Sequence, residues 1–199
     1  MAWSRRLFLA FSTLALAGPV NAHQIKPDDI SGPGTDPVHF MMEDVNGTVV
    51  NDENLIGRLS LVFFGYTSCP DVCPTTLATI AAALKAMGSD GDKILPLFIS
   101  LDPARDTRKV LSDYVANFDP RIVGLRGPKD FTDATAKSFG VDYEIVTPDP
   151  AKPQDYSVDH SASIILVGPD AIIIKRYGHS MPAEDMAKDL QKILGELKL

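Results

Sequence analysis

The 199-residue chain has little cysteine and no surplus of positive charge. It contains two cysteines, and its formal net charge at pH 7 is −7. Acidic side chains in excess oppose the binding of nucleic acid or anionic lipid, so neither is an expected partner. Since two cysteines can form at most one disulfide, the fold must depend on a buried apolar core.

The chain also lacks a confident membrane-spanning run, which needs about 20 consecutive apolar residues. A shorter apolar run at 7–17 follows Arg5 and Arg6 and precedes small residues at 20–22 that are typical of a signal peptidase site. The paired arginines resemble a twin-arginine export signal. We therefore predict that residues 1–22 are a cleaved export signal and that the protein is periplasmic. An uncleaved leader would anchor it to the membrane.

The remainder is expected to form one domain. Residues 23–37 are rich in proline, glycine and aspartate and predict a flexible lead-in. Residues 38–199 contain no internal repeat or low-complexity tract, and they are enough to bury one core.

Strand and helix signals alternate along this domain. Asn46-Gly47 is typical of a two-residue turn and predicts a hairpin of strands at 40–43 and 48–51. Apolar runs predict strands at 59–64, 94–101, 122–125, 162–167 and 171–177, and amphipathic stretches predict helices at 75–87, 107–118, 130–139 and 182–197. A segment rich in proline and aspartate before 162 predicts a loop. This order indicates an α/β fold with a mixed central sheet flanked by helices and an N-terminal β-hairpin.

Both cysteines fall within FGYTSCPDVCPTTL at 64–77. Cys69 follows the predicted strand at 59–64, and Cys73 precedes Pro74, which is favoured at the first position of a helix. Open α/β sheets place their chemistry at this edge. The positive end of a helix favours thiolate, so we predict that the cysteine pKa is lowered and that both thiols, if exposed, are reactive.

The spacing of the cysteines leaves their chemistry open. A structural disulfide would contribute little, because the loop it closes is very short. Three intervening residues separate the pair, rather than the two of C-x-x-C oxidoreductases. One helical turn would place both sulfurs on one face, suitable for a shared metal ion at about 2.3 Å or, after adjustment, for a disulfide.

A third ligand would favour metal binding, and imidazole is the commonest metal-binding side chain. Of the four histidines, His160 stands directly before the predicted strand at 162–167, where the proposed winding of the sheet would turn it toward the cysteine helix. Cleavage after Ala22 would leave His23 as the N-terminus, where its amine and imidazole would offer a second copper site.

Three segments together resemble the SCO/SenC family of copper-binding assembly factors: FFGYTSCPDVCPTTL at 63–77, SLDPARDT at 100–107 and YSVDHSASIILVGPD at 156–170. The resemblance extends from about residue 38 to the C-terminus. It implies a thioredoxin-like fold with an added N-terminal hairpin. It also implies one copper ion, Cu(I) or Cu(II), held by Cys69, Cys73 and His160, with Asp159 supporting the site and Asp71 shaping the loop.

The family resemblance implies a copper metallochaperone for the copper-accepting subunit of cytochrome c oxidase. A second periplasmic copper chaperone or a thiol reductant would be a further partner. Two thiolates and an imidazole suit Cu(I), whereas a structural zinc site requires four protein ligands. The alternative is a thiol–disulfide oxidoreductase that reduces the oxidase cysteines through Cys69 and Cys73. Only the metallochaperone requires His160.

Overall fold

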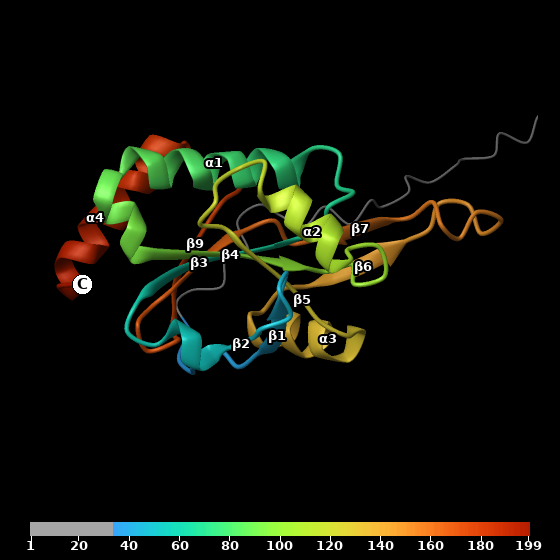
Figure 1. The fold of residues 1–199 in the computed structure, drawn as a ribbon, viewed down its shortest axis with the longest axis horizontal. Coiled ribbons are helices and arrows are strands. Elements are labelled where there is room, and N and C mark those ends of the chain that lie inside the picture. Colours follow the sequence, from blue (N-terminus) through green and yellow to red (C-terminus); the bar gives the residue numbers. More distant parts are fainter. Residues whose placement is uncertain (1–33) are drawn as a thin grey trace, which may run out of the picture.

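A computed structural model describes residues 34–199 (Figure 1). The predicted export signal at 1–22, His23 and most of the predicted lead-in lie outside the described residues. The end of that lead-in is attached to the sheet, because the N–H of Gly34 donates to the carbonyl of Ile173 (2.9 Å) and Pro37 bridges Ile172. Within residues 34–199, every helix is too short or too polar to traverse a bilayer.

The core of the fold is a seven-stranded sheet with the order β2-β1-β5-β4-β3-β8-β9. Its strands are β1 (Met41–Asp44), β2 (Val49–Asn51), β3 (Leu59–Gly65), β4 (Ile94–Ser100), β5 (Val123–Arg126), β8 (Ile164–Val167) and β9 (Ile173–Tyr177). The helices are α1 (Val72–Ala86), α2 (Arg108–Val115), α3 (Lys129–Ser138) and α4 (Ala183–Leu197), with short 3-10 helices η1 (Asp52–Leu55) and η2 (Gly88–Lys93).

The sheet is mixed, as predicted. Strands β3, β4 and β5 are parallel. Strand β8 runs antiparallel beside β3, β9 runs antiparallel to β8, and β1 of the β1–β2 hairpin pairs antiparallel with β5. Helices α1, α2 and α4 cover one face and α3 covers the other (Figure 1). All seven residues of β3 are buried, so this strand is enclosed on both faces. The predicted α/β sheet flanked by helices, with its N-terminal hairpin, is confirmed.

One prediction is wrong in the segment before residue 162. That segment contains a second antiparallel pair, β6 (Tyr143–Val146) and β7 (Ser157–His160), which forms its own two-stranded sheet. His160 is therefore the last residue of a strand and not part of a loop. Each strand has only four residues and the connection at 147–156 contains three prolines, so the turn signal outweighed the strand signal.

Helix α1 begins earlier than predicted. Its first residue is Val72, so Cys73 lies inside the first turn and Pro74 is not the first helical position. Proline is tolerated there because the first backbone N–H groups of a helix have no partner within it. Asp71 is the N-cap and contributes its carbonyl, which accepts from the hydroxyl of Thr75 (2.9 Å). Cys69 stays outside the helix, so the two cysteines do not share a helical face.

A glycine at the end of β3 makes room for Cys73. A Cβ atom at Gly65 would lie 2.8 Å from the Cys73 sulfur and 2.9 Å from the ring of Phe98. These separations are closer than side-chain carbons approach one another. The absence of a side chain thus allows the thiol to pack against the strand end.

Replacing Gly65 with alanine should lower the free energy of unfolding by about 1–3 kcal/mol, the usual cost of overpacking a core. Urea denaturation of the reduced protein measures this change. Gly195→Ala in α4 is the matched control, because an added Cβ there meets no atom within 4 Å. It should raise the free energy of unfolding by up to about 1 kcal/mol. Equal effects of the two substitutions would contradict the steric explanation.

Candidate metal centre

The two cysteines lie on either side of the start of α1. Cys73 is fully buried in the first helical turn, and Cys69 is partly exposed in the loop that follows β3. The backbone N–H of Cys73 donates to the sulfur of Cys69 (3.4 Å), and both residues are free thiols. The sulfurs are therefore neighbours without being linked.

His160 faces the buried cysteine. Its Nε2 atom lies 3.7 Å from the sulfur of Cys73, although the two residues are 87 positions apart. Its Nδ1 atom lies 3.1 Å from the carbonyl oxygen of Ser161. A carbonyl can only accept a hydrogen bond, so Nδ1 carries the proton and Nε2 presents its lone pair toward Cys73. The rings of Phe63 and Tyr66 stand edge-on to the imidazole, with centroids 6.2 and 6.4 Å away.

Burial controls the protonation of this pair. Desolvation raises the pKa of the Cys73 thiol well above its usual range, which corrects the prediction that the helix terminus lowers it. Desolvation also lowers the pKa of His160, against the opposing effects of the Ser161 carbonyl and the charge of Asp159. At neutral pH the pair is consequently an uncharged thiol and an uncharged imidazole.

The side chains of the three predicted ligands, Cys69, Cys73 and His160, are not arranged around a common centre. Among residues 34–199, no group of three or more His, Cys, Asp or Glu side chains stands close enough together to hold a metal ion. The arrangement is a contact between Cys73 and His160, with Cys69 adjoining Cys73. His39 and His179 take no part: His39 pairs with Asp52 (2.9 Å), and His179 is exposed beyond β9.

The two predicted supporting aspartates are exposed. Asp159 pairs with Glu144 across the β6–β7 hairpin, and the contact to the imidazole Nδ1 is made by the Ser161 carbonyl instead. Asp71 caps α1 through its backbone. That Asp159 supports the site and that Asp71 shapes the loop stay predictions.

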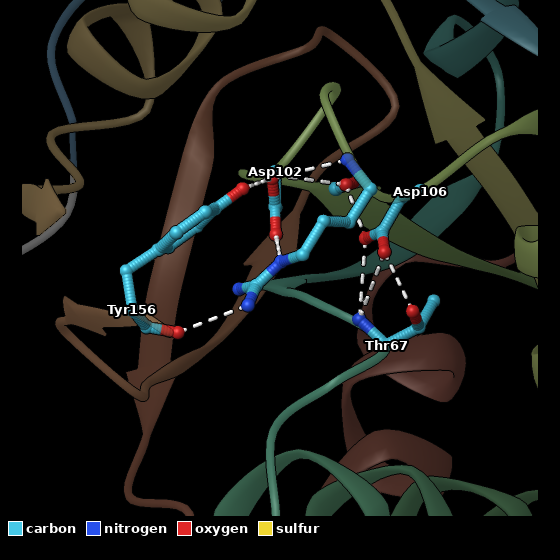
Figure 2. A network of polar contacts seen from close by, with 6 residues as sticks. Thr67, Asp102, Asp106 and Tyr156 are labelled. Atoms are coloured by element: carbon cyan, nitrogen blue, oxygen red, sulfur yellow. Dashed lines mark hydrogen bonds and ion pairs between the residues drawn. The ribbon is translucent and has the colours of Figure 1, made fainter. Parts of the chain in front are cut away.

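A polar network lies beside the loop between β3 and α1 at 66–71, here called the cysteine loop (Figure 2). No role was predicted for its residues from the sequence, although they lie within the segments that resemble the SCO/SenC family. Buried Asp106 accepts hydrogen bonds from the N–H (3.2 Å) and hydroxyl (2.6 Å) of Thr67 and from the hydroxyl of Ser100 (2.6 Å). Thr67 stands two residues before Cys69. Asp106 therefore fixes the beginning of the cysteine loop.

The same network reaches the strand that carries His160. Asp102, which is also buried, accepts from the hydroxyl of Tyr156 (2.7 Å) and forms an ion pair with Arg105. Burial and this hydrogen bond raise the pKa of Tyr156 to about 12, so its hydroxyl stays protonated. Arg105 donates to the carbonyl of Tyr156 (2.9 Å) and lies over its ring, 3.7 Å from the centroid. A signal for this network was available: two acids and an arginine directly after a buried strand.

The fold and site define a thioredoxin-like protein with a cysteine pair and a histidine at one edge of the sheet. The SCO1/SenC family model matches residues 31–195, and the chain belongs to this family. The copper-bound structure of ScoI from Bradyrhizobium japonicum shares 39% identity with a TM-score of 0.71, covering 78% of this chain and 98% of that chain.

Two sequence relatives show how much of the chain is shared. A SCO2-like protein of Rickettsia prowazekii is 35% identical over 171 residues, covering 86% of this chain and 80% of that protein. Protein sco1 of Schizosaccharomyces pombe is 36% identical over 150 residues, covering 75% of this chain and 57% of that protein. The chain thus spans little more than half the length of the S. pombe protein.

The raised pKa of Cys73 predicts a loss of stability at alkaline pH. Above about pH 8.5 an unfolded cysteine releases its proton, whereas the folded protein retains it, so rising pH favours unfolding. The contribution of this thiol is fully present below that pH. The free energy of unfolding should fall by up to about 1.4 kcal/mol per pH unit above it. Urea denaturation of the reduced protein across this range measures the slope.

Two variants isolate the source of the alkaline slope. Cys73→Ala removes the buried thiol and should flatten the slope, while Cys69→Ala retains that thiol and should keep the slope of the unsubstituted protein. An unaltered slope in Cys73→Ala would show that Cys73 is not the group responsible.

Proposed function

We propose that this chain is a copper metallochaperone that binds one copper ion through Cys69, Cys73 and His160 outside the cytoplasm. It would deliver the ion to the copper-accepting subunit of cytochrome c oxidase. Two facts support the proposal: ScoI has been solved with copper bound, and the Sco family is one of cytochrome c oxidase assembly proteins. The location rests on the export pattern at 1–22, which lies outside the described residues.

The observation that carries the proposal is the distance between the Cys73 sulfur and Nε2 of His160. Two ligand atoms bound to one ion at about 2.3 Å for sulfur and about 2.05 Å for nitrogen stand about 3.8 Å apart in a trigonal arrangement. The observed separation is 3.7 Å. These two atoms therefore lie as far apart as an ion between them requires, with the lone pair of Nε2 already directed at the sulfur.

Cys69 would complete the set by a local movement. Its sulfur now accepts the N–H of Cys73, and its side chain is partly exposed in a loop. Rotation about one side-chain bond is enough to redirect a sulfur, and exposed side chains change rotamer within nanoseconds. A site closed by an exposed ligand is suited to a cargo that must be released again.

The chemistry of these donors favours copper. Two thiolates and an imidazole form a soft set that suits three-coordinate Cu(I). Binding would displace the proton of the buried Cys73 thiol, because thiolate is the form that binds metal. Thiolate and cation would then neutralise one another inside a site that disfavours an isolated charge.

A second candidate function is thiol–disulfide exchange with the cysteines of the oxidase. The unequal exposure of the pair favours it, since partly exposed Cys69 is accessible to a partner disulfide whereas Cys73 is enclosed beneath it. A thiol reductant outside the cytoplasm would regenerate the pair. The two functions are compatible, because copper binding itself needs both thiols reduced.

Replacing His160 with alanine should separate the two functions. We expect Cu(I) affinity to fall by more than about 100-fold, because loss of a ligand exceeds the 10–100-fold effect typical of residues that merely support a ligand. Competition with a chromophoric Cu(I) chelator measures the affinity. The rate at which Cys69 reacts with a small disulfide reagent should stay within about twofold, since the exposed thiol is retained.

His179→Ala is the matched control for this experiment. It removes an exposed imidazole beyond β9 and should leave copper affinity and thiol exchange unchanged. Undiminished copper affinity in His160→Ala would reject the metallochaperone and favour the oxidoreductase.

A further inference from the structure

The main sheet alone does not fix the position of His160 relative to Cys73. Strand β7 pairs only with β6, and these two strands form a separate sheet with no ladder to β3. Residues 161–163 connect β7 to β8 of the main sheet, and the relative placement of these two bodies, the hairpin and the main sheet, depends further on side chains. Interactions that bridge the β6–β7 hairpin and the cysteine loop must supply that placement.

Arg105 makes two direct contacts on the hairpin side of this junction and a third contact with Asp102. Its Nη1 atom donates to the carbonyl of Tyr156, the residue directly before β7. Its guanidinium lies over the ring of Tyr156, and both groups share the carboxylate of Asp102, which binds the guanidinium and the tyrosine hydroxyl. A planar guanidinium can stack and donate in several directions at once, which the ammonium group of lysine cannot do.

The same arginine also reaches the cysteine side. Its guanidinium lies 5.6 Å from the ring centroid of Tyr66, whose carbonyl accepts the N–H of Cys69 (3.3 Å). The next residue of the chain, Asp106, binds both polar hydrogens of Thr67 at the start of the cysteine loop (Figure 2). Two adjacent residues after β4 thus contact both bodies.

The other polar anchor of the hairpin lies away from the cysteines. The hydroxyl of Tyr143 donates to Asp133, and Lys129 lies near the Tyr143 ring, so this anchor attaches β6 to α3. Among the described residues, this anchor joins β6 to α3 and not to the cysteine loop. The bridge through Arg105 is accordingly a polar connection that lies near both Cys73 and His160.

We infer that Arg105 is a positioning residue that holds the β6–β7 hairpin against the cysteine loop and so keeps His160 at ligand distance from Cys73. This inference rests on the proposed copper site. Arg105 does not itself bind the ion. It acts through the placement of His160, and its effect on copper should therefore depend on His160 being present.

A double-mutant cycle tests that dependence. We expect Arg105→Gln to weaken Cu(I) affinity by about tenfold in the otherwise unsubstituted, reduced protein, in line with other groups that orient a ligand. The same substitution in a His160→Ala background should have no effect, since there is no imidazole left to place. Competition with a chromophoric chelator gives the affinity of all four proteins, and thermal melting of the apo forms gives their stability.

Arg121→Gln is the matched control. Arg121 also bridges two aspartates, Asp119 and Asp92, and its side chain is 28% exposed compared with 27% for Arg105. Arg121 lies near the amino ends of β4 and β5, whereas the cysteines follow the carboxyl end of β3, so the two sites lie at opposite ends of the parallel strands. Arg121→Gln should lower the melting temperature while leaving Cu(I) affinity unchanged in both backgrounds.

Arg105→Lys distinguishes shape from charge. It retains a cation but not the stacked, forked geometry, so its copper affinity should match that of Arg105→Gln.

If Arg105→Gln does not fold, the double variant Asp102→Asn with Arg105→Gln replaces it. That pair leaves no unpartnered carboxylate and still lets Tyr156 donate to an amide oxygen. The combined variant should show the same tenfold loss that disappears without His160.

The outcomes separate this inference from the proposed function. Unchanged copper affinity in His160→Ala alone would overturn the proposed site, and the inference with it. A loss in His160→Ala without a loss in Arg105→Gln would overturn only the inference. An equal loss on removing Arg105 in both backgrounds, or wild-type affinity in Arg105→Lys, would show that Arg105 acts by stability or charge and not by placing His160.

Discussion

The contact between the buried thiol of Cys73 and the imidazole of His160 is the interaction on which the site depends. Cys73 is buried and His160 is partly buried, and desolvation favours the uncharged form of each. The Ser161 carbonyl fixes which imidazole nitrogen faces the sulfur. An uncharged pair tolerates burial without a counter-ion. The fold can therefore hold this sulfur and this imidazole nitrogen next to one another at little electrostatic cost.

The fold assembles this pair from two bodies. Strand β3 and α1 present the sulfur, and Gly65 provides the space for it, while the β6–β7 hairpin presents the imidazole. Residues after β4 then join the two through Asp102, Arg105 and Asp106. The chemistry lies at the carboxyl end of parallel strands, where several elements that are distant in sequence converge.

Much of this could be predicted from the sequence. Apolar runs located the strands of the main sheet, and the three proposed ligands were named by their residue types and by family resemblance. The β6–β7 hairpin was missed because prolines in its connection resemble a loop. The predicted direction of the Cys73 pKa shift was wrong. A helix terminus can be recognised in the sequence, whereas desolvation depends on which residues pack around the sulfur. The role of Arg105 depends on contacts between segments that no local pattern records.

The unequal depth of the two cysteines determines how an ion could leave. If copper is held as proposed, Cys73 is closed off by the core, and an incoming donor atom from another protein would approach on the side of the partly exposed ligands, Cys69 and His160. Exchange would then begin at a partly exposed ligand, and the Cys73 bond would be the last to break. The acceptor would have to dock in one orientation, so the burial of a single sulfur would give the transfer its direction.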